Sequence, residues 1–183
     1  MDRTQVILVD ENDKQVGLTE KMFAHQQGLL HRAVSVFVFS SAGKLLLQKR
    51  ANSKYHGAGL WTNTCCTHPL ENEGAEDCAH RRLKEEMGFD CDLEKKFAFT
   101  YRSEVENDLI EHEYDHVFFG VYDGEVDSDS QEVEDHTFVS IDKIREDLEE
   151  NPDKYSVWFR IIVENHKNHL TGMEHQLKKA VGV

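Results

Sequence analysis

The chain lacks the long apolar run that a membrane-spanning helix requires. No part of its 183 residues approaches the roughly 20 consecutive apolar residues that cross a bilayer. The first residues, Met-Asp-Arg-Thr-Gln, also do not lead from a basic residue into an apolar segment, as a secretory signal peptide would. We therefore expect a cytoplasmic protein that has no membrane partner.

Cysteine is scarce, with four residues at positions 65, 66, 78 and 91. The absence of a Cys-x-x-Cys pair argues against a zinc ribbon, and four irregularly placed cysteines are too few for a disulfide scaffold. A bridge between the neighbours Cys65 and Cys66 would be strained, so free thiols in a reducing compartment are expected. Cys78 and Cys91 are predicted to be small buried hydrophobic residues.

The chain also lacks an excess of basic residues. Its formal net charge is −14, and 18 of its acidic residues lie between positions 104 and 150, where only Lys143 and Arg145 are basic. The rest of the chain is close to neutral, with 17 acidic and 19 basic residues. A nucleic acid partner is therefore not expected, whereas an anionic substrate is compatible with this charge. The sequence leaves open the role of the acidic segment and the oligomeric state.

The length of the chain fits a single domain, with a core from about residue 4 to 170 and a loose tail at 171–183. Strands are predicted at 5–10, 33–40, 44–50, 61–64, 97–101, 115–122 and 136–141. The segments 33–40 and 44–50 are predicted to form a β-hairpin around Ser41-Ala42-Gly43, and 123–135 an acidic loop.

Helices are predicted at 75–87, 142–150 and 157–169. In the first of these, Ala75, Ala79, Leu83 and Met87 recur every four positions, and Gly88 follows as a C-terminal stop. Strands flanked by helices indicate an α/β (α+β) fold, and there is no internal repeat or interdomain linker.

Three histidines and two glutamates lie in contexts that resemble strand ends or loops beside functional groups. They are His25, His31, His68, Glu111 and Glu113. Nitrogen and carboxylate ligands of this number would fill an octahedral site for a divalent transition metal. Cys66 lies two residues before His68, so a reactive thiol is expected next to the metal. The remaining histidines lack such contexts and are interpreted as surface or core residues: His56, His80, His112, His116, His136, His166, His169 and His175.

The helix at 75–87 carries the motif Arg-Arg-Leu-Lys-Glu-Glu-Met-Gly-Phe, which is similar to the second half of the Nudix box. In that family the box binds divalent cations that hold a diphosphate. Glu73, Glu85 and Glu86 stand at box positions, but Thr67 replaces the opening glycine and Arg82 the first helical glutamate. Because one metal-binding carboxylate is missing, the helix suits diphosphate binding better than hydrolysis.

From the residues alone, two interpretations of Arg82 stay open. Together with Glu86, four residues later, it can present a guanidinium to a phosphate and a carboxylate to the Mg²⁺ that bridges it. Alternatively, the two residues form an ordinary surface ion pair worth a few tenths of a kcal/mol.

Further segments resemble type I isopentenyl-diphosphate isomerases. They include Glu-Lys-Met-Phe-Ala-His at 20–25, Leu-His-Arg-Ala at 30–33, Leu-Gln-Lys-Arg-Ala at 47–51 and Lys-Tyr-His at 54–56. Leu-Trp-Thr-Asn-Thr-Cys-Cys-Thr-His-Pro at 60–69, Glu-His-Glu at 111–113 and Tyr-Ser-Val-Trp at 155–158 complete the series. The resemblance runs in order from about residue 4 to 158. It implies a Nudix-like fold, with a mixed β-sheet packed between helices, that has given up hydrolysis.

The resemblance implies a role for each matching position. The divalent-metal ligands are His25, His31, His68, Glu111 and Glu113, and Glu86 is a ligand to a Mg²⁺ that arrives with the diphosphate. Cys66 and Glu113 match the catalytic acid/base pair. The phosphate-binding cations are Lys21, Arg50, Lys54 and Arg82, and the aromatic residues of the hydrocarbon pocket are Tyr101 and Trp158. The metal at the His/Glu site is expected to be Mn²⁺, Mg²⁺ or Zn²⁺.

The implied chemistry agrees with these residue types. Moving a double bond along an isopentenyl chain adds a proton at one carbon and removes one from another, through a tertiary carbocation. Glu113, steadied by Tyr101, is a credible proton carrier, and Cys66 as thiolate is a candidate partner base. Trp158 can stabilise the cation without trapping it, although a tryptophan on a C-terminal helix is also a common core residue. Which group acts first, and the direction of the reaction in the cell, stay open.

The sequence leaves three functions to compare. The first is the isomerase of isopentenyl and dimethylallyl diphosphate. The second is a Nudix-type diphosphohydrolase, which is disfavoured because Arg82 stands where a carboxylate is needed. The third is a non-enzymatic module that binds metal or diphosphate, which would predict a damaged acid/base pair, whereas Cys66 and Glu113 are both present.

Overall fold

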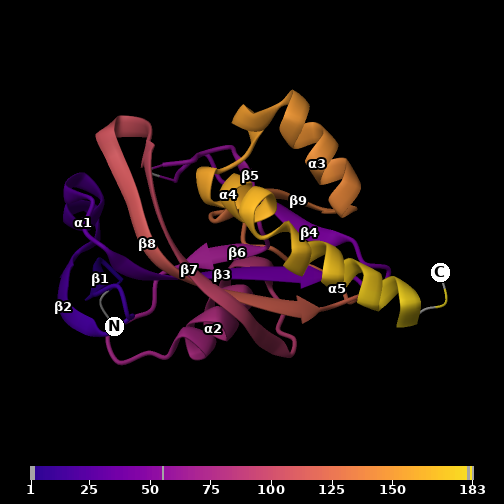
Figure 1. Cartoon of the computed structure of the whole chain (residues 1–183), viewed down its shortest axis with the longest axis horizontal. Helices are drawn as coiled ribbons and strands as arrows, with labels where there is room; N and C mark the ends of the chain where they lie inside the picture. The colour runs from indigo at the N-terminus through magenta and orange to yellow at the C-terminus, as the bar shows by residue number, and fades with distance from the viewer. Residues whose placement is uncertain (1–2, 55, 181, 183) are drawn as a thin grey trace.

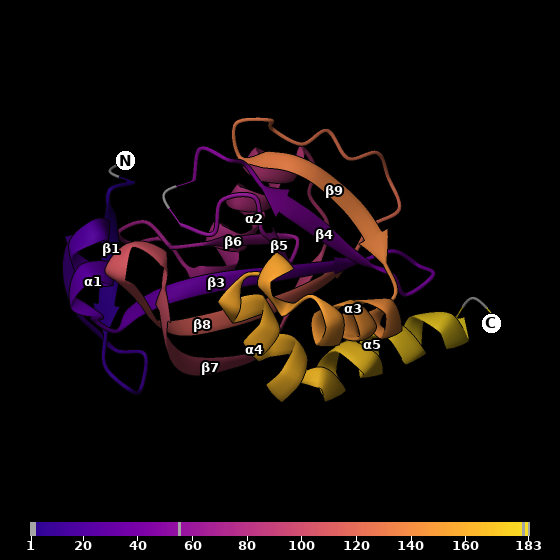
Figure 2. The same cartoon turned by 90° about the horizontal axis from the view of Figure 1, so that it is seen from above.

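The architecture is a β-sheet covered by helices on both faces. The structure is a computed structural model and describes residues 3–54, 56–180 and 182. Figures 1 and 2 show helix α2 (Ala75–Met87) on one face of the sheet and helices α3 (Ile141–Glu150), α4 (Val157–Asn165) and α5 (Lys167–Ala180) on the other. Within the described residues, no helix combines the length and apolar character needed to cross a membrane.

The remaining elements follow in chain order. The strands are β1 (Gln5–Val9), β2 (Gln15–Glu20), β3 (His31–Phe39), β4 (Leu45–Arg50), β5 (Trp61–Thr62), β6 (Cys65–Thr67), β7 (Leu93–Val105), β8 (Leu109–Val121) and β9 (Val133–Val139). A short helix α1 (Lys21–Gln27) precedes β3, and two 3₁₀ turns lie at η1 (Glu106–Asp108) and η2 (Pro152–Lys154).

The sheet is buried on both faces because its central strand is apolar on both. Successive side chains of a strand point to opposite faces. In β3, Val34, Val36 and Val38 therefore pack in the core beneath α2. Phe37 and Phe39 pack in the core beneath the C-terminal helices. This layering confirms the predicted α+β class with a mixed sheet between helices.

The strand pairing differs from the predicted hairpin. The segments 33–40 and 44–50 meet at a single register pair, Phe39 with Leu45, and then diverge. Strand β3 pairs instead with β8 in parallel over nine residues and with β6 antiparallel, while β4 pairs with β9. The predicted hairpin is thus formed at its turn but is much shorter than expected, because local patterning carries no signal for partners such as β8 and β9 that lie far along the chain.

Helix α2 has the predicted bounds. It ends at Gly88, whose φ of 75° lies in the left-handed region and whose N–H donates to the Lys84 carbonyl. A second constraint also requires glycine, since a Cβ at this position would lie 2.1 Å from the carbonyl oxygen of Asp127. The acidic loop between β8 and β9 therefore packs directly against the end of α2.

Several elements differ from the sequence prediction. Strand β2 and helix α1 were not predicted. Helix α1 has only seven residues and no apolar repeat, and the Glu20 side chain caps the N-terminus of this helix. Strands β7 and β8 are longer than predicted, since polar residues interrupt their apolar pattern. The expectation of a loose tail at 171–183 was wrong as far as Ala180, because α5 runs to that residue.

The packing of α5 gives a test by two substitutions. Leu170 is fully buried in the core beneath the C-terminal helices, so Leu170→Ala should lower the free energy of unfolding by about 2–4 kcal/mol. Gly172 is exposed and a Cβ there would meet nothing within 4 Å, so Gly172→Ala should raise it by about 0.5–1 kcal/mol. Urea denaturation measures both. If neither variant differs from the wild type, α5 is not a docked helix in solution.

Candidate active site

Strand register brings distant residues to one end of the sheet. In the parallel pair β3/β8, His31 lies opposite Glu113, and in the antiparallel pair β7/β8, Tyr101 also lies opposite Glu113. In the pair β3/β6, Cys66 lies opposite Ser35. Because residues two apart on a strand share a face, Glu111 and Glu113 point the same way. The sheet therefore places a thiol, a phenol, a carboxylate pair and an imidazole together.

Four of the predicted metal ligands form a cluster. One potential ligand atom from each of His25, His31, His68 and Glu113 lies within 4.8 Å of all the others. His25 comes from α1, His31 from the start of β3, His68 from the residue after β6 and Glu113 from β8. The fifth predicted ligand, Glu111, joins them through its Oε2, which lies 3.4 Å from Nε2 of His25.

The histidines are held in the orientation that metal ligands need. The backbone carbonyl of Lys21 accepts from Nδ1 of His25 at 2.7 Å, and that of Leu29 from Nδ1 of His31 at 2.8 Å. A carbonyl only accepts, so Nδ1 carries the proton and the Nε2 lone pair faces the cluster. Nε2 of His31 is buried and has no hydrogen-bond partner among the described residues. This set of nitrogen and oxygen donors fits a divalent metal ion.

His56, interpreted from the sequence as a surface or core residue, lies beside this cluster. Its Nε2 lies 2.6 Å from Oε1 of Glu111, and its ring centroid is 5.8 Å from that of His25 and 5.7 Å from that of Trp158. The histidine is buried, because its loop is fastened to the sheet: Arg50 donates to the carbonyls of His56 and Gly57, each at 3.1 Å. A lone histidine between two loop residues offers no periodic signal that could have identified it.

The candidate acid/base residues lie beside the cluster. The Tyr101 hydroxyl donates to Oε2 of Glu113 at 2.6 Å, and Nε2 of His68 lies 2.9 Å from Oε1 of the same carboxylate. Nη1 of Arg50 donates to the Cys66 sulfur at 3.6 Å. Glu113 is thus held from two sides, and the thiol contacts the Arg50 guanidinium.

Burial is the largest influence on the pKa values of these groups. It raises the pKa of Cys66 to about 12, against the opposing effect of Arg50, and the pKa of Tyr101 well above its usual value. It also lowers the pKa of His68 to about 4. For Glu113, burial and Glu111 act to raise the pKa, but the contacts with His31 and His68 outweigh them and leave it below its usual value. The thiol therefore holds its proton while the carboxylate is ionised.

These residues line a cavity of about 110 Å³ that Trp158 closes on one side. The indole is fixed, since its Nε1 donates to Oδ1 of Asn63 at 3.2 Å, and the hydroxyl of Ser156, two residues earlier, donates to that of Thr62 at 2.8 Å. The cavity lining includes Cys66, His56, His68, Glu111, Glu113 and Trp158. The thiol, the carboxylate and the indole thus line one shared cavity.

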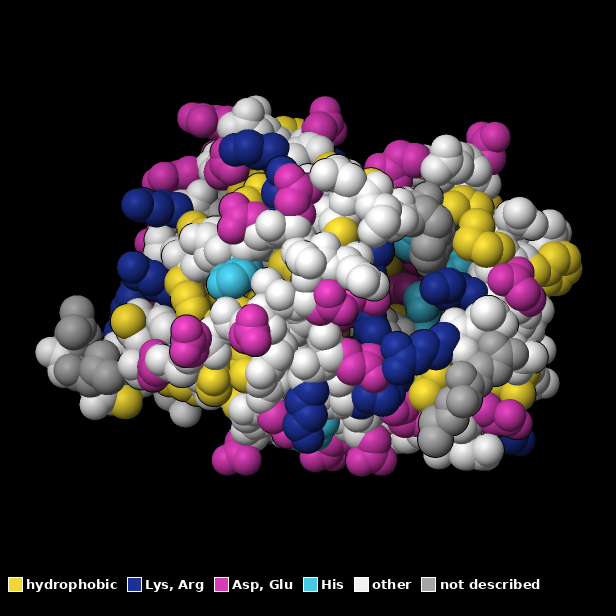
Figure 3. Space-filling model, turned by 180° about the vertical axis from the view of Figure 1, so that it is seen from behind, with side chains coloured by type: hydrophobic (Ala, Val, Ile, Leu, Met, Phe, Trp, Pro, Cys, Tyr) yellow, Lys and Arg dark blue, Asp and Glu magenta, His cyan; other side chains and the backbone are white. Residues whose placement is uncertain are grey.

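The four predicted phosphate-binding cations line the same cavity: Lys21, Arg50, Lys54 and Arg82. Figure 3 shows Lys and Arg side chains gathered at the edge of a hollow in which histidine side chains are visible. Burial lowers the pKa of Lys21, and the positive charges of Lys54 and Arg82 lower it further, as expected where cations converge. The group of four is called the cation cradle below.

Glu86 lies apart from the His/Glu cluster. It is buried on α2, where Oε2 accepts from Nε2 of Gln48 at 2.9 Å and Oε1 contacts the Arg82 guanidinium. The pair that the sequence suggested for Arg82 and Glu86 is therefore formed, but it lies beside the cavity and is not an exposed surface pair. The predicted site residues thus divide into a metal cluster, an acid/base pair and a cation cradle.

Comparison with known proteins gives a consistent result. Residues 29–159 match the NUDIX domain family. The chain is 54% identical over 160 residues to "Isopentenyl-diphosphate Delta-isomerase 1" of Aromatoleum aromaticum, covering 87% of this chain and 90% of that protein. It is 49% identical over 160 residues to "Isopentenyl-diphosphate Delta-isomerase" of Burkholderia multivorans, covering 87% and 91%. A crystal structure of a Deinococcus radiodurans protein shares the fold with a TM-score of 0.67 at 16% identity, covering 80% and 90% of the two chains.

We predict that His56 increases the affinity of the site for its metal ion through its contact with Glu111. Partners that orient metal ligands typically contribute 10- to 100-fold to binding, so His56→Ala should weaken the binding of Mn²⁺ or Zn²⁺ by about that factor. His56→Gln, which keeps a hydrogen-bond donor, should recover part of the loss. His80→Ala is a matched control, because His80 pairs with Asp90 away from the cavity. Unchanged metal affinity in His56→Ala, measured by competition with a chelator, would show that His56 only fills space.

Proposed function

The chain belongs to the isopentenyl-diphosphate Delta-isomerase family, within the NUDIX domain family, and we propose that Cys66 and Glu113 carry the proton transfers of its reaction. It is an isomerase of isoprenoid biosynthesis that interconverts isopentenyl and dimethylallyl diphosphate. The observation that carries the proposal is that the Cys66 thiol, the Glu113 carboxylate and the hydrogen-bonded Trp158 indole line one small cavity.

The reaction requires one group that gives a proton and another that takes one. Adding a proton to the terminal carbon of isopentenyl diphosphate places positive charge on the tertiary carbon, and loss of a proton from the carbon next to it forms dimethylallyl diphosphate. Cys66 enters with a proton because burial keeps the thiol neutral, and Glu113 enters ionised. The sequence suggested a Cys66 thiolate as the base, but the burial of this thiol favours its acid form at the start of a cycle.

Tyr101 keeps Glu113 in place during these transfers. Its hydroxyl donates to one carboxylate oxygen at 2.6 Å, while His68 contacts the other at 2.9 Å. A carboxylate held at both oxygens keeps its position as its charge changes, which general acid/base catalysis requires. Tyr101 thus acts on the substrate through Glu113.

The surroundings protect the carbocation. Trp158 can stabilise a cation over its ring by roughly 0.5–2 kcal/mol and has no nucleophile to trap it. The carboxylate of Glu113 is buried and the Cys66 thiol is partly buried, which limits the access of water to the reacting carbons. Asn63 occupies the polar edge of the indole, and the Arg50 guanidinium lies over the ring with its Cζ 5.2 Å from the centroid, so the opposite ring face is the one left for the hydrocarbon.

The donor set fits one divalent ion at His25, His31, His68, Glu111 and Glu113. Such an ion would supply positive charge that fixes the Glu113 carboxylate and adjusts its acidity. Mixed nitrogen and oxygen ligands accept Mn²⁺, Mg²⁺ or Zn²⁺. We infer a separate Mg²⁺ for the diphosphate, with Glu86 as its protein ligand and the cation cradle holding the phosphate oxygens.

Hydrolysis of the diphosphate is the second candidate, and the structure supports it less. Arg82 fills the box position of a metal-binding carboxylate, and its guanidinium contacts Glu85 and Glu86. The carboxylates of α2 are thereby neutralised by a cation that is also placed to bind phosphate. A cluster of carboxylates free to hold several Mg²⁺ ions, as hydrolysis requires, is not formed among the described residues of α2.

Incubation with isopentenyl diphosphate and Mg²⁺ in D₂O, followed by proton NMR, tests the function. Dimethylallyl diphosphate containing deuterium is expected, because both proton transfers exchange with solvent. Cys66→Ala should lower the rate of its formation by about 10²–10⁴-fold with metal content unchanged. Orthophosphate or isopentenyl monophosphate would indicate a hydrolase, and an unchanged spectrum of the wild type a binding protein.

Cys65→Ala is the matched control for this experiment. Cys65 and Cys66 are adjacent in β6, but Cys65 is buried beneath α2 and does not line the cavity. Its replacement should cost some stability and leave the rate within a few-fold of the wild type. Full activity in Cys66→Ala, or equal losses in the two variants, would remove the thiol from the mechanism.

Trp158 gives an independent prediction. Trp158→Leu should lower kcat by about 2- to 30-fold, the range that corresponds to losing a cation–π interaction, with the metal content unchanged. Trp158→Phe, which keeps an aromatic face, should retain more of the activity. Equal kcat values for the leucine and phenylalanine variants would mean that Trp158 serves packing and not the carbocation.

A further inference from the structure

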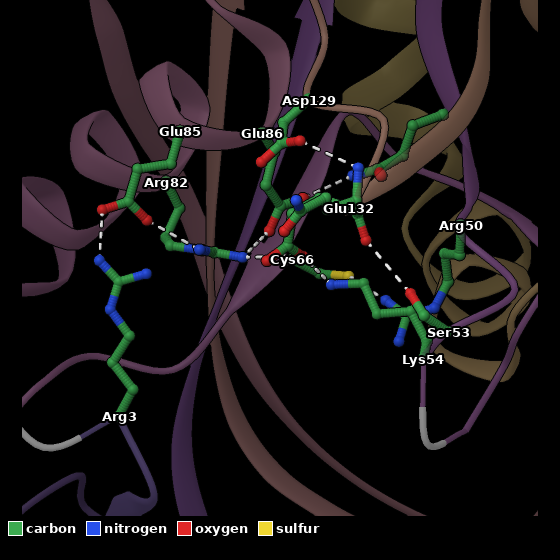
Figure 4. Close-up of polar contacts among 12 residues, drawn as sticks. Arg3, Arg50, Ser53, Lys54, Cys66, Arg82, Glu85, Glu86, Asp129 and Glu132 are labelled. Carbon is green, nitrogen blue, oxygen red and sulfur yellow. Dashed lines mark hydrogen bonds and ion pairs between the residues drawn. The ribbon is translucent and has the colours of Figure 1, made fainter.

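One carboxylate lies inside the cation cradle without any assigned role. Glu132, at the end of the acidic loop before β9, contacts Nζ of Lys54 through Oε2 and lies 3.3 Å from Nη2 of Arg82 through the same oxygen. Figure 4 shows these two cations reaching the Glu132 carboxylate from different elements. A single anionic oxygen thus bridges two of the four cations that are proposed to hold the diphosphate.

The backbone fixes this position. The N–H of Ala51, just after β4, donates to the Glu132 carbonyl at 3.0 Å, and the Ser53 hydroxyl donates to the Gln131 carbonyl at 3.2 Å. On the other side, the N–H of Asp129 donates to the Glu86 carbonyl at 3.0 Å. The loop is therefore fastened to the two segments that supply Lys54 and Arg82, the region after β4 and helix α2.

The chemistry of Glu132 is that of a phosphate oxygen. Burial acts to raise the pKa of Glu132, but the contacts with Lys54 and Arg82 lower it below its usual value, so the group is ionised at neutral pH. An ionised carboxylate offers anionic oxygens that accept charge-assisted hydrogen bonds from Lys and Arg, as a phosphate does. A diphosphate that uses the same two cations has to replace this oxygen.

We propose that Glu132 competes with the substrate diphosphate for Lys54 and Arg82 and thereby weakens its binding. This rests on the proposed function of the cation cradle. Substrate and product of the isomerase carry the same diphosphate, so binding that group more tightly would stabilise both and would not favour the transition state. A built-in competitor lowers the affinity for both and allows the product to leave.

Glu132→Gln tests the competition, because the amide keeps a hydrogen-bond acceptor near Lys54 and Arg82 but removes the charge. Inorganic pyrophosphate with Mg²⁺ is the probe, and calorimetry gives its Kd. We expect the variant to bind about tenfold more tightly, the effect of removing one negative charge a few ångström from an anion. The KM for isopentenyl diphosphate should fall by a similar factor. Loss of structure cannot produce a gain of affinity.

Two further variants separate this proposal from the proposed function. Glu134→Gln is the matched control, since Glu134 pairs with Lys49 and Asn52 and does not line the cavity, and its Kd should equal that of the wild type. Lys54→Gln should weaken pyrophosphate binding at least tenfold. If Lys54→Gln has no effect, the assignment of the cradle is wrong.

Either of two results would overturn the proposal that Glu132 competes with the diphosphate. One is weaker pyrophosphate binding in Lys54→Gln together with unchanged or weaker binding in Glu132→Gln. The other is an equal gain in Glu132→Gln and Glu134→Gln, which would reflect net charge alone. Glu132→Ala tests the same position a second time. The backbone hydrogen bond that anchors the loop at this residue does not need the side chain, so this variant should also gain affinity.

Discussion

The parallel pairing of β3 with β8 is the constraint on which the site depends. Nine register pairs join the two strands, and the first of them sets His31 beside Glu113. Because β8 also pairs with β7, the same register places Tyr101 next to Glu113, and β6 adds Cys66 on the other side of β3. A shift of one residue in the β3/β8 register would turn Glu111 and Glu113 away from the histidines, since a strand alternates its faces.

The substrate has a hydrocarbon part and a diphosphate, and the two parts need different surroundings. The carbons need a dry, apolar space with a proton donor and acceptor, which the sheet and α4 provide around Cys66 and Glu113. The diphosphate needs positive charge, which α1, β4 and its following loop, and α2 provide through the cation cradle. In the proposed function, α1, α2 and the region of β4 would hold the charged end, and Cys66 in β6 and Glu113 in β8 would carry the proton transfers.

The sequence predicted what depends on local pattern and motif, and it failed where distant segments meet. Helix α2 was predicted residue by residue because its apolar residues recur every four positions and Gly88 stops it. The pairing of β4 with β3 is shorter than the sequence predicted, and its pairing with β9 was missed because no local feature reveals that β9 lies beside it. His56 was missed for the same reason, since its role comes from Glu111, which lies far along the chain and is brought near only by the fold.

The two adjacent cysteines of β6 determine what a one-residue shift in the pairing of this strand would do to the site. Cys65 faces the core beneath α2 and Cys66 faces the cavity. If β6 paired one residue out of register, the other cysteine would enter the cavity, and a thiol would still meet the substrate. His68, which follows on the same segment, would then face away from Glu113. After such a shift a cysteine would still line the cavity, but the candidate metal ligand His68 would not. The correct register of this short strand is therefore needed for the histidine and not for the thiol.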